Sequence, residues 1–318
     1  MAILTTPQRI SVTVALAIAG SISPAAAAIK HTGGATIGEL DSVRVYDASD
    51  PDRPILTKQL DVNATSGPFA LAHDALFVAS GKEVRRVDRQ NLSQSQPEFS
   101  TWSAPAPILS LTDGTERGLV LALDSRGLTL VRFSDESTPV EVWSYAVNAA
   151  VADQNHGRLV VRDGNRAFVA DASLPGVRVV SIEPDQAPKT IATYVSPDGV
   201  IHDLALWGRR LTLATDSGLA VVNVSAGDEP KLTRRGALDM DPTPTRVDVN
   251  SRYAFVANGR SLSVVDIDPN SPGFLSCRMD GWDASTDILS VRLDKANRAY
   301  VLVHGAYEIL DLGPYGGK

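Results

Sequence analysis

A five-residue segment that recurs six times constrains the fold more than any other feature of the sequence. Most copies begin with a small or basic residue, and the positions that follow are mainly aliphatic or aromatic. The copies are Ala75–Ala79, Gly118–Ala122, Arg166–Ala170, Arg210–Ala214, Tyr253–Ala257 and Arg298–Leu302, and their starts lie 43, 48, 44, 43 and 45 residues apart. Self-similarity at such a period indicates an architecture built from one repeated supersecondary unit.

A second apolar strand follows each segment and closes on a polar or turn position. The closing positions are Asp88, Phe133, Ser181, Asn223, Asp266 and Asp311, with a seventh upstream at Asp47. A proline follows each of them within nine residues. Proline withholds a backbone donor, so it belongs in a turn after the strand and not within a ladder.

Each unit is therefore predicted to contain four short strands, A to D. Arg246–Val249 exemplifies strand A, the recurring segment is strand B, Leu219–Val224 exemplifies strand C, and Pro188–Val195 exemplifies strand D. Four strands in about 40–45 residues are the signature of a β-propeller. Tandem sandwich domains would need about 100 residues each and no such period. We predict an all-β fold, a β-propeller of four-stranded blades.

The number of blades is predicted from the strand inventory. Strand C occurs seven times and strand A six times, which favours seven blades with the first and the last incomplete. The first unit has at most a weak strand B at Gly34–Gly38. In the alternative, six blades form and Pro54–Asp61 closes the last blade as its outer strand.

Several of these segments resemble LVIVD repeats, which occur in secreted and surface-exposed bacterial and archaeal proteins. The segments that carry the resemblance are Val45–Pro54 (VYDASDPDRP), Arg166–Pro188, Gly218–Pro230 and Tyr253–Pro272 (YAFVANGRSLSVVDIDPNSP). The resemblance covers nearly all of the chain after residue 28 and is poor around Lys82–Pro97 and Gly127–Pro139. It implies a propeller outside the cytosol. It implies no catalytic activity, because the shared motif consists of strands and turns.

The N-terminus has the order of a secretory signal peptide. Arg9 precedes the apolar run Ile10–Ile22, and the small-residue tract Ala25–Ala28 follows Pro24. The run of about 13 residues is short of the roughly 20 that span a bilayer. We predict a cleaved signal at residues 1–28, a single propeller domain at residues 29–318 without a membrane span, and a periplasmic or secreted product.

Composition narrows the chemistry further. The net charge of −7 gives no general electrostatic case for nucleic-acid binding. Cys277 is the only cysteine, which excludes an internal disulfide and a multi-cysteine metal site. We predict no catalytic residues, no metal and no cofactor. The carboxylate-rich turns, such as Asp266–Asn270, are expected to bond their own backbone N–H groups instead of binding calcium.

The starts of the A strands are the best place for a ligand site, because the innermost strands of a propeller line its central channel. The candidate ligand-binding residues there are Arg158, His202, Asp203, Arg246 and Asp287. The arginines could grip a carboxylate or phosphate. In the alternative, the same residues form a hydrated funnel mouth that ion pairs hold together.

Two classes of function remain open. The first is a non-catalytic scaffold, expected to be monomeric, that binds a protein or a surface polymer through its loop faces. The second is a periplasmic enzyme, such as a lactonase, a lyase or a quinoprotein-like oxidoreductase, with its site at the channel mouth. An enzyme should show converging charged residues with shifted pKa values at one mouth.

Overall fold

The described part of the chain is built from strands that form small antiparallel sheets. In the computed structural model, the described residues are 40–47, 55–64, 68–71, 75–88, 100–114, 116–134, 138–147, 158–171, 173–284, 287–293, 298–303 and 306–311. The predicted signal peptide and the segment Gly34–Gly38 lie outside them. No helix occurs in the described ranges.

The strands group into seven sheets, which we number as blades 1 to 7 in chain order. Blade 1 contains β1 (Leu40–Asp47) and β2 (Ile55–Ala64). Blade 2 contains β3 (Phe69–Leu71), β4 (Ala75–Ser80), β5 (Glu83–Asp88) and β6 (Ser100–Ser103). Blade 3 contains β7 (Ile108–Asp113), β8 (Leu119–Asp124), β9 (Gly127–Arg132) and β10 (Val140–Ala146). Blade 4 contains β11 (Val160–Asp163), β12 (Arg166–Asp171), β13 (Gly176–Ser181) and β14 (Lys189–Val195).

The remaining blades continue the same order. Blade 5 contains β15 (Ile201–Trp207), β16 (Arg210–Thr215), β17 (Gly218–Val224) and β18 (Leu232–Asp239). Blade 6 contains β19 (Arg246–Val249), β20 (Tyr253–Asn258), β21 (Ser261–Asp266) and β22 (Cys277–Asp283). Blade 7 contains β23 (Ile288–Leu293), β24 (Arg298–Val303) and β25 (Ala306–Asp311). The predicted all-β propeller is confirmed, and each recurring segment forms strand B of a blade.

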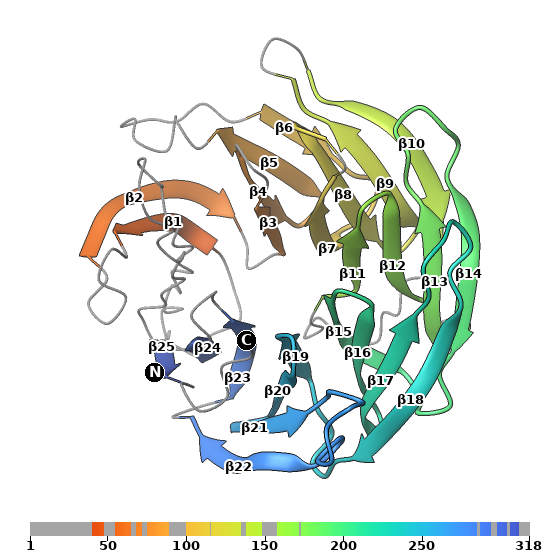
Figure 1. The fold of residues 1–318 in the computed structure, drawn as a ribbon. Helices are drawn as coiled ribbons and strands as arrows, with labels where there is room; N and C mark the ends of the chain where they lie inside the picture. Colours follow the sequence, from red (N-terminus) through yellow and green to blue (C-terminus); the bar gives the residue numbers. More distant parts are fainter. Residues whose placement is uncertain are drawn as a thin grey trace, which may run out of the picture.

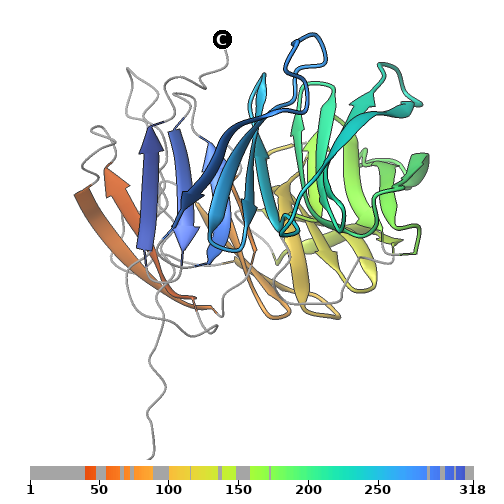
Figure 2. The same cartoon turned by 90° about the horizontal axis from the view of Figure 1, so that it is seen from below.

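The blades stand around a central axis, with strand A innermost and strand D outermost (Figure 1). The A strands of neighbouring blades contact one another from β3 round to β23. One face of the disc carries the turns between strands A and B and the loops between strands C and D, and we call it the AB/CD face. The opposite face is the BC/DA face. In Figure 2 the AB/CD face points upward.

The described strands of blade 1 and blade 7 are fewer than four, as the seven-blade interpretation expects. Strand β2 overlaps the segment that the six-blade alternative places on the outer edge of the last blade. It pairs instead with β1, from Asp47 opposite Ile55 to Leu40 opposite Ala64. The first sheet is therefore separate from the sheet of blade 7.

The core lies between adjacent blades and is supplied mainly by strands B and C. Phe77, Phe168 and Phe255 occupy the same place in strand B of blades 2, 4 and 6, and all three are fully buried. The poorly matching unit at blade 3 has an apolar residue, Phe133, at the closing position. Its ring meets that of Phe77 edge to face at 5.2 Å. Packing between blades thus replaces the polar turn residue there.

A close backbone approach explains the glycines that open strand C in the middle blades. A Cβ atom on Gly127, Gly176 or Gly218 would lie 2.1, 1.9 or 2.1 Å from a carbonyl oxygen near the end of the adjacent strand D. No other residue type avoids that overlap. The repeated glycine is therefore a packing requirement of the blade.

Candidate functional site

Asp203 occupies the centre of the predicted channel site. Its carboxylate, fully buried, accepts hydrogen bonds from the backbone N–H of Arg158 in blade 4 at 2.5 Å and of Val247 in blade 6 at 2.9 Å. It also accepts from the N–H of Leu204 at 2.9 Å. The inner edge of strand A has no neighbouring strand, so its N–H groups need other acceptors. Asp203 supplies them for three successive blades.

Arg158 reaches from blade 4 past blade 5 to blade 6. Its guanidinium donates to the carbonyl oxygen of Val247 at 2.7 Å and to Oδ1 of Asp248 at 2.8 Å. Burial opposes the charge of this side chain, but Asp248 and Asp203 outweigh that effect and raise the pKa of Arg158. The arginine expected to grip a ligand therefore has its principal bonds within the protein.

Arg246 lies beside the same carboxylate. Its side chain is buried and donates to the carbonyl oxygen of Thr245 at 2.7 Å. Burial lowers the pKa of Arg246, and the charge of Asp203 opposes that change. The two arginines and the carboxylates of Asp203 and Asp248 give the cluster a balance of two positive and two negative charges.

Similar hydrogen bonds link the innermost strands of other neighbouring blades. The carboxylate of Asp248 accepts from the N–H of Leu293 in blade 7 at 2.9 Å. The hydroxyl of Ser110 in blade 3 accepts from the N–H of Leu159 in blade 4 at 3.3 Å. Ser110 and Asp248 were not predicted, because only the first positions of the A strands were candidates. Each is a polar residue with apolar residues on both sides, and that pattern is visible in the sequence.

His202 does not join this cluster. The pairing of β15 with β16 shifts between Ile201 and Asp203, so His202 is the extra residue of a β-bulge. A bulge redirects a side chain relative to regular alternation. The Nε2 atom of His202 lies 2.9 Å from the carboxylate of Asp216, in the turn between β16 and β17. Asp287, the fifth predicted residue, is exposed just before β23.

The structure thus brings together Arg158, Asp203 and Arg246, while His202 has a carboxylate partner in another turn. Both groups of the cluster with shifted pKa values are arginines. Arginine stays protonated in proteins and supplies neither a general acid nor a general base. What this arrangement can do chemically is hold the inner strands together.

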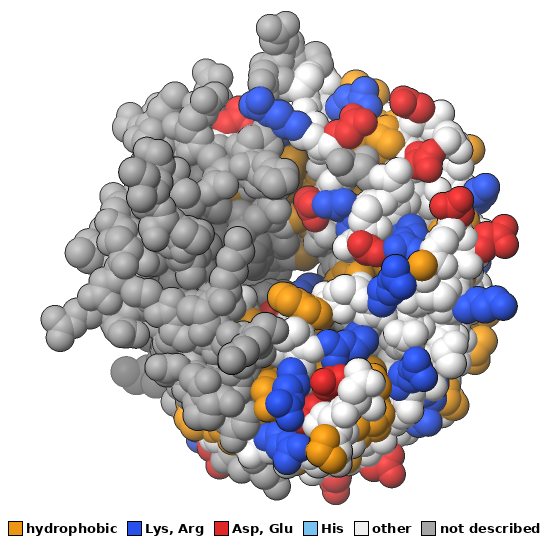
Figure 3. Space-filling view, viewed as in Figure 1, with side chains coloured by type: hydrophobic (Ala, Val, Ile, Leu, Met, Phe, Trp, Pro, Cys, Tyr) orange, Lys and Arg blue, Asp and Glu red, His pale blue; other side chains and the backbone are white. Residues whose placement is uncertain are grey.

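A second concentration of arginines lies on the AB/CD face. Figure 3 shows Lys and Arg side chains gathered around the central hollow on the described part of this face. Arg162 pairs with Asp113 and Arg166 with Asp163, both at 2.5 Å. Arg210 donates instead to backbone carbonyls of blade 6, those of Ile267 at 3.1 Å and of Ser251. Neither of these bonds pairs the positive charge of Arg210 with a carboxylate.

The turn between β15 and β16 adds two exposed side chains to this face. The indole of Trp207 is 48% exposed, and Arg209 is exposed at the tip of the turn. No described residue forms an ion pair or a hydrogen bond with the Arg209 guanidinium. The sequence analysis did not select either residue.

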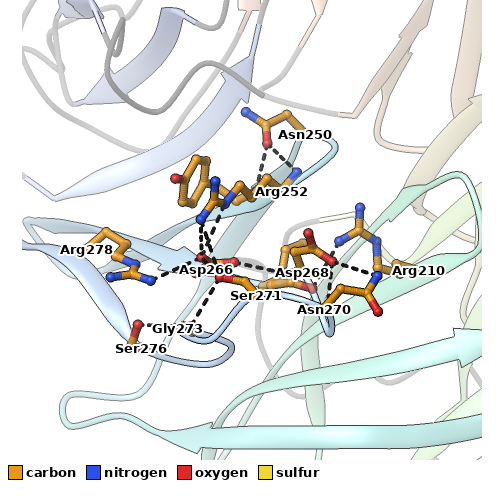
Figure 4. Close-up of polar contacts among 12 residues, drawn as sticks. Arg210, Asn250, Arg252, Asp266, Asp268, Asn270, Ser271, Gly273, Ser276 and Arg278 are labelled. Carbon is orange, nitrogen blue, oxygen red and sulfur yellow. Dashed lines mark hydrogen bonds and ion pairs between the residues drawn. The ribbon is translucent and has the colours of Figure 1, made fainter. Parts of the chain in front are cut away.

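The loop between β21 and β22 is organised by the buried carboxylate of Asp266 (Figure 4). It accepts from the hydroxyl of Ser271 at 2.7 Å and from the guanidinium groups of Arg252 at 3.1 Å and Arg278 at 3.3 Å. It also accepts from the N–H of Asp268, two residues on, at 3.1 Å. The turn interpretation of Asp266–Asn270 is confirmed. The other hydrogen bonds to this carboxylate come from two arginines and a hydroxyl.

The described residues contain no group of three or more His, Cys, Asp or Glu side chains that could hold a metal ion. Cys277 is exposed at the start of β22, and its Sγ lies 3.0 Å from the carbonyl oxygen of Met279.

Comparison with known families finds an LVIVD repeat at residues 245–277. This segment spans β19, β20 and β21 and ends at the start of β22, so it includes the Asp266 loop. The resemblance stated from the sequence is confirmed for this repeat. No curated protein matches the chain significantly in sequence.

Several solved structures have a similar fold and share little sequence identity with this chain. The WD40 β-propeller domain of Doa1 has a TM-score of 0.62 and 14% identity, covering 96% of this chain and 93% of that one. Hydrazine synthase of Kuenenia stuttgartiensis has a TM-score of 0.63 and 11% identity, covering 94% of each chain. A protein from Lactobacillus plantarum has a TM-score of 0.61 and 13% identity, covering 80% of this chain and 87% of that one. At these identities the likeness establishes the fold alone.

Proposed function

We propose that the protein is an exported, non-catalytic scaffold that binds a protein or a surface polymer through the loop faces of its propeller. One observation carries the proposal. Arg158, the channel residue best suited to bind an anion, donates through one guanidinium nitrogen to the carbonyl oxygen of Val247 and to the carboxylate of Asp248, two blades away. The polar groups near the axis are thereby used for cohesion between blades, which leaves the turns and loops to provide specificity.

The nature of the charged groups also favours a scaffold over the enzyme alternative. A channel enzyme needs groups that exchange protons or attack substrate near neutral pH. In the inner cluster the groups with shifted pKa values are Arg158 and Arg246, and neither exchanges a proton at such pH. Asp203 accepts three backbone hydrogen bonds, so its oxygens are engaged.

The location and assembly of the protein are part of the same proposal. Residues 1–28 are expected to direct export, and the LVIVD repeat at residues 245–277 is in keeping with a protein that acts outside the cytosol. A search of the described residues finds no helix long and apolar enough to cross a membrane. We propose a monomer in the periplasm or outside the cell.

Site-specific photo-crosslinking in the native host tests this function. The crosslinking amino acid replaces Arg209 on the AB/CD face, Arg126 on the BC/DA face, or Arg246 at the axis. We expect a discrete macromolecular adduct from at least one loop position and none from Arg246. The enzyme alternative predicts a different result, a small molecule that copurifies with the protein and is lost on Arg246→Lys. That result without a loop adduct would reject the scaffold.

A further inference from the structure

We propose that the turn between β15 and β16, with Trp207, Arg209 and Arg210, binds an acidic polypeptide segment of the partner. This inference rests on the scaffold function and specifies both the face that binds and the chemistry of what it binds. The turn exposes the ring of Trp207, and the hydrogen bonds of the neighbouring Arg210 go to backbone carbonyls and not to a carboxylate.

The geometry of the turn holds these side chains as one unit. Trp207 and Arg210 are directly paired in the register of β15 and β16, so their side chains project from the same side of the hairpin. Gly208 adopts a positive φ of 55°, which keeps the turn tight. Arg210 is further fixed by its bonds to the carbonyl oxygens of Ile267 and Ser251. The aromatic ring and one guanidinium are therefore positioned before any partner arrives.

Charge distinguishes this turn from its neighbours on the AB/CD face. Arg162, Arg166 and Arg252 each have a carboxylate partner, whereas the bonds of Arg210 go to backbone carbonyls. Arg209 is exposed at the tip. Two positive charges thus stand beside Trp207 and can bind carboxylates of a partner. Trp and Arg are also the residues that contribute most to protein–protein interfaces.

The periphery of the same face argues for a polypeptide segment and against an extended polyanion. The C–D loop of blade 4 carries the exposed carboxylate of Asp185, and that of blade 5 carries Asp228 and Glu229 beside the exposed Lys231. A long anionic polymer lying across the disc would meet these like charges. A short acidic segment that reaches the inner turn would avoid them. The excess of carboxylates on these two loops and the arginines of the inner turn together fit a local contact.

The test uses the full exported protein and a fluorescein-labelled peptide of alternating Glu and Leu, followed by fluorescence anisotropy at low ionic strength. We expect saturable binding that weakens when Gln replaces Glu in the peptide and when salt is added. Trp207→Ala and Arg209→Ala should each raise the Kd by about fivefold or more, since such contacts are among the stronger ones of an interface. Arg126→Ala removes the same charge from an exposed turn on the opposite face and should leave the Kd unchanged.

Three outcomes would overturn the inference. They are the absence of saturable binding, an equal loss with Arg126→Ala, and tighter binding of polygalacturonate than of the peptide. The last outcome would assign the surface to an acidic glycan. If Trp207→Ala leaves the crosslink from position 209 intact, the inference fails while the scaffold function stands. If the crosslinks come only from the axis, the scaffold function itself fails.

Discussion

Arg158 and Arg209 show how differently the same side chain is used in neighbouring blades. Arg158 precedes the innermost strand of blade 4 and is bonded to two groups of blade 6. Arg209 follows the innermost strand of blade 5, but it lies on the AB/CD face and is exposed. Nearness to the axis therefore does not identify a binding residue. What distinguishes the two is that the Arg158 guanidinium already bonds to blade 6, whereas no described residue bonds to that of Arg209.

The largest effect is expected from removing the carboxylate at the axis. Asp203→Ala should lower the free energy of unfolding by about 3–5 kcal/mol, because it leaves the N–H groups of Arg158 and Val247 without this acceptor and removes a negative charge from beside Arg158 and Arg246. Urea-induced unfolding measures this loss. Asp185→Ala removes an exposed carboxylate and serves as the control. Similar stability of the two variants would show that Asp203 does not stabilise the contacts between the blades.

A smaller loss is expected when the tie between blades 4 and 6 is removed. Arg158→Ala should cost about 2–3 kcal/mol, since it breaks charge-assisted bonds to Asp248 and to the carbonyl oxygen of Val247. A double-mutant cycle with Asp248→Ala measures how much of that loss belongs to the pair. Additive losses in the cycle would contradict the direct contact.

Asp266 offers a test of a third kind of arginine contact, on a C–D loop. Burial by itself would raise the pKa of the Asp266 carboxyl, but hydrogen bonds from Ser271, the N–H of Asp268 and Arg252 outweigh it and lower the pKa. A lowered pKa in the folded state means that the carboxylate stabilises the fold above its ordinary pKa of about 4. That contribution is lost as the pH falls through the lower, folded-state value.

Asp266→Asn should therefore cost about 1–2 kcal/mol at pH 7, and its difference from the wild type should shrink as the pH falls below about 4. Unfolding measured from pH 7 to pH 3 tests this. A difference that stays constant over the range would mean that charge is not the source of the stabilisation.

The smallest effect on stability is expected at the exposed tip of the turn between β15 and β16. Arg209→Ala should change the free energy of unfolding by less than about 0.5 kcal/mol, because the side chain is exposed and no described residue bonds it. Thermal unfolding beside Arg126→Ala is the measurement. A loss as large as that of Arg158→Ala would remove the contrast between the two arginines.

Much of the fold follows from the sequence because each blade repeats the same local pattern. The apolar strand B, the closing residue of strand C and the following proline are all short-range signals, and β20 and β21 lie where the pattern places them. The adjacency of Arg158, Asp203 and Arg246 follows from the same register. These predictions needed only the period and the alternation of the strands.

The bonding of the site could not be predicted in the same way. A single-residue bulge turns His202 towards Asp216, and nothing in the local sequence marks it. The reach of Arg158 to blade 6 depends on the curvature of the ring, which brings residues 90 positions apart into contact. The exposure of Trp207 likewise depends on where its strand ends on the disc. The reach of Arg158 thus arises from assembly of the blades, whereas the bulge and the contact of His202 lie within one blade.

The contact from Arg158 to blade 6 also limits how this array of repeats can change during evolution. In a simple repeat protein each unit interacts only with its neighbours, so units can be duplicated or lost one at a time. Here the arginine of blade 4 and the carbonyl and carboxylate of blade 6 must stay separated by one blade. Inserting or deleting a blade between them would move the partners apart. Blades 4 to 6 therefore have to keep this order for the contact to persist.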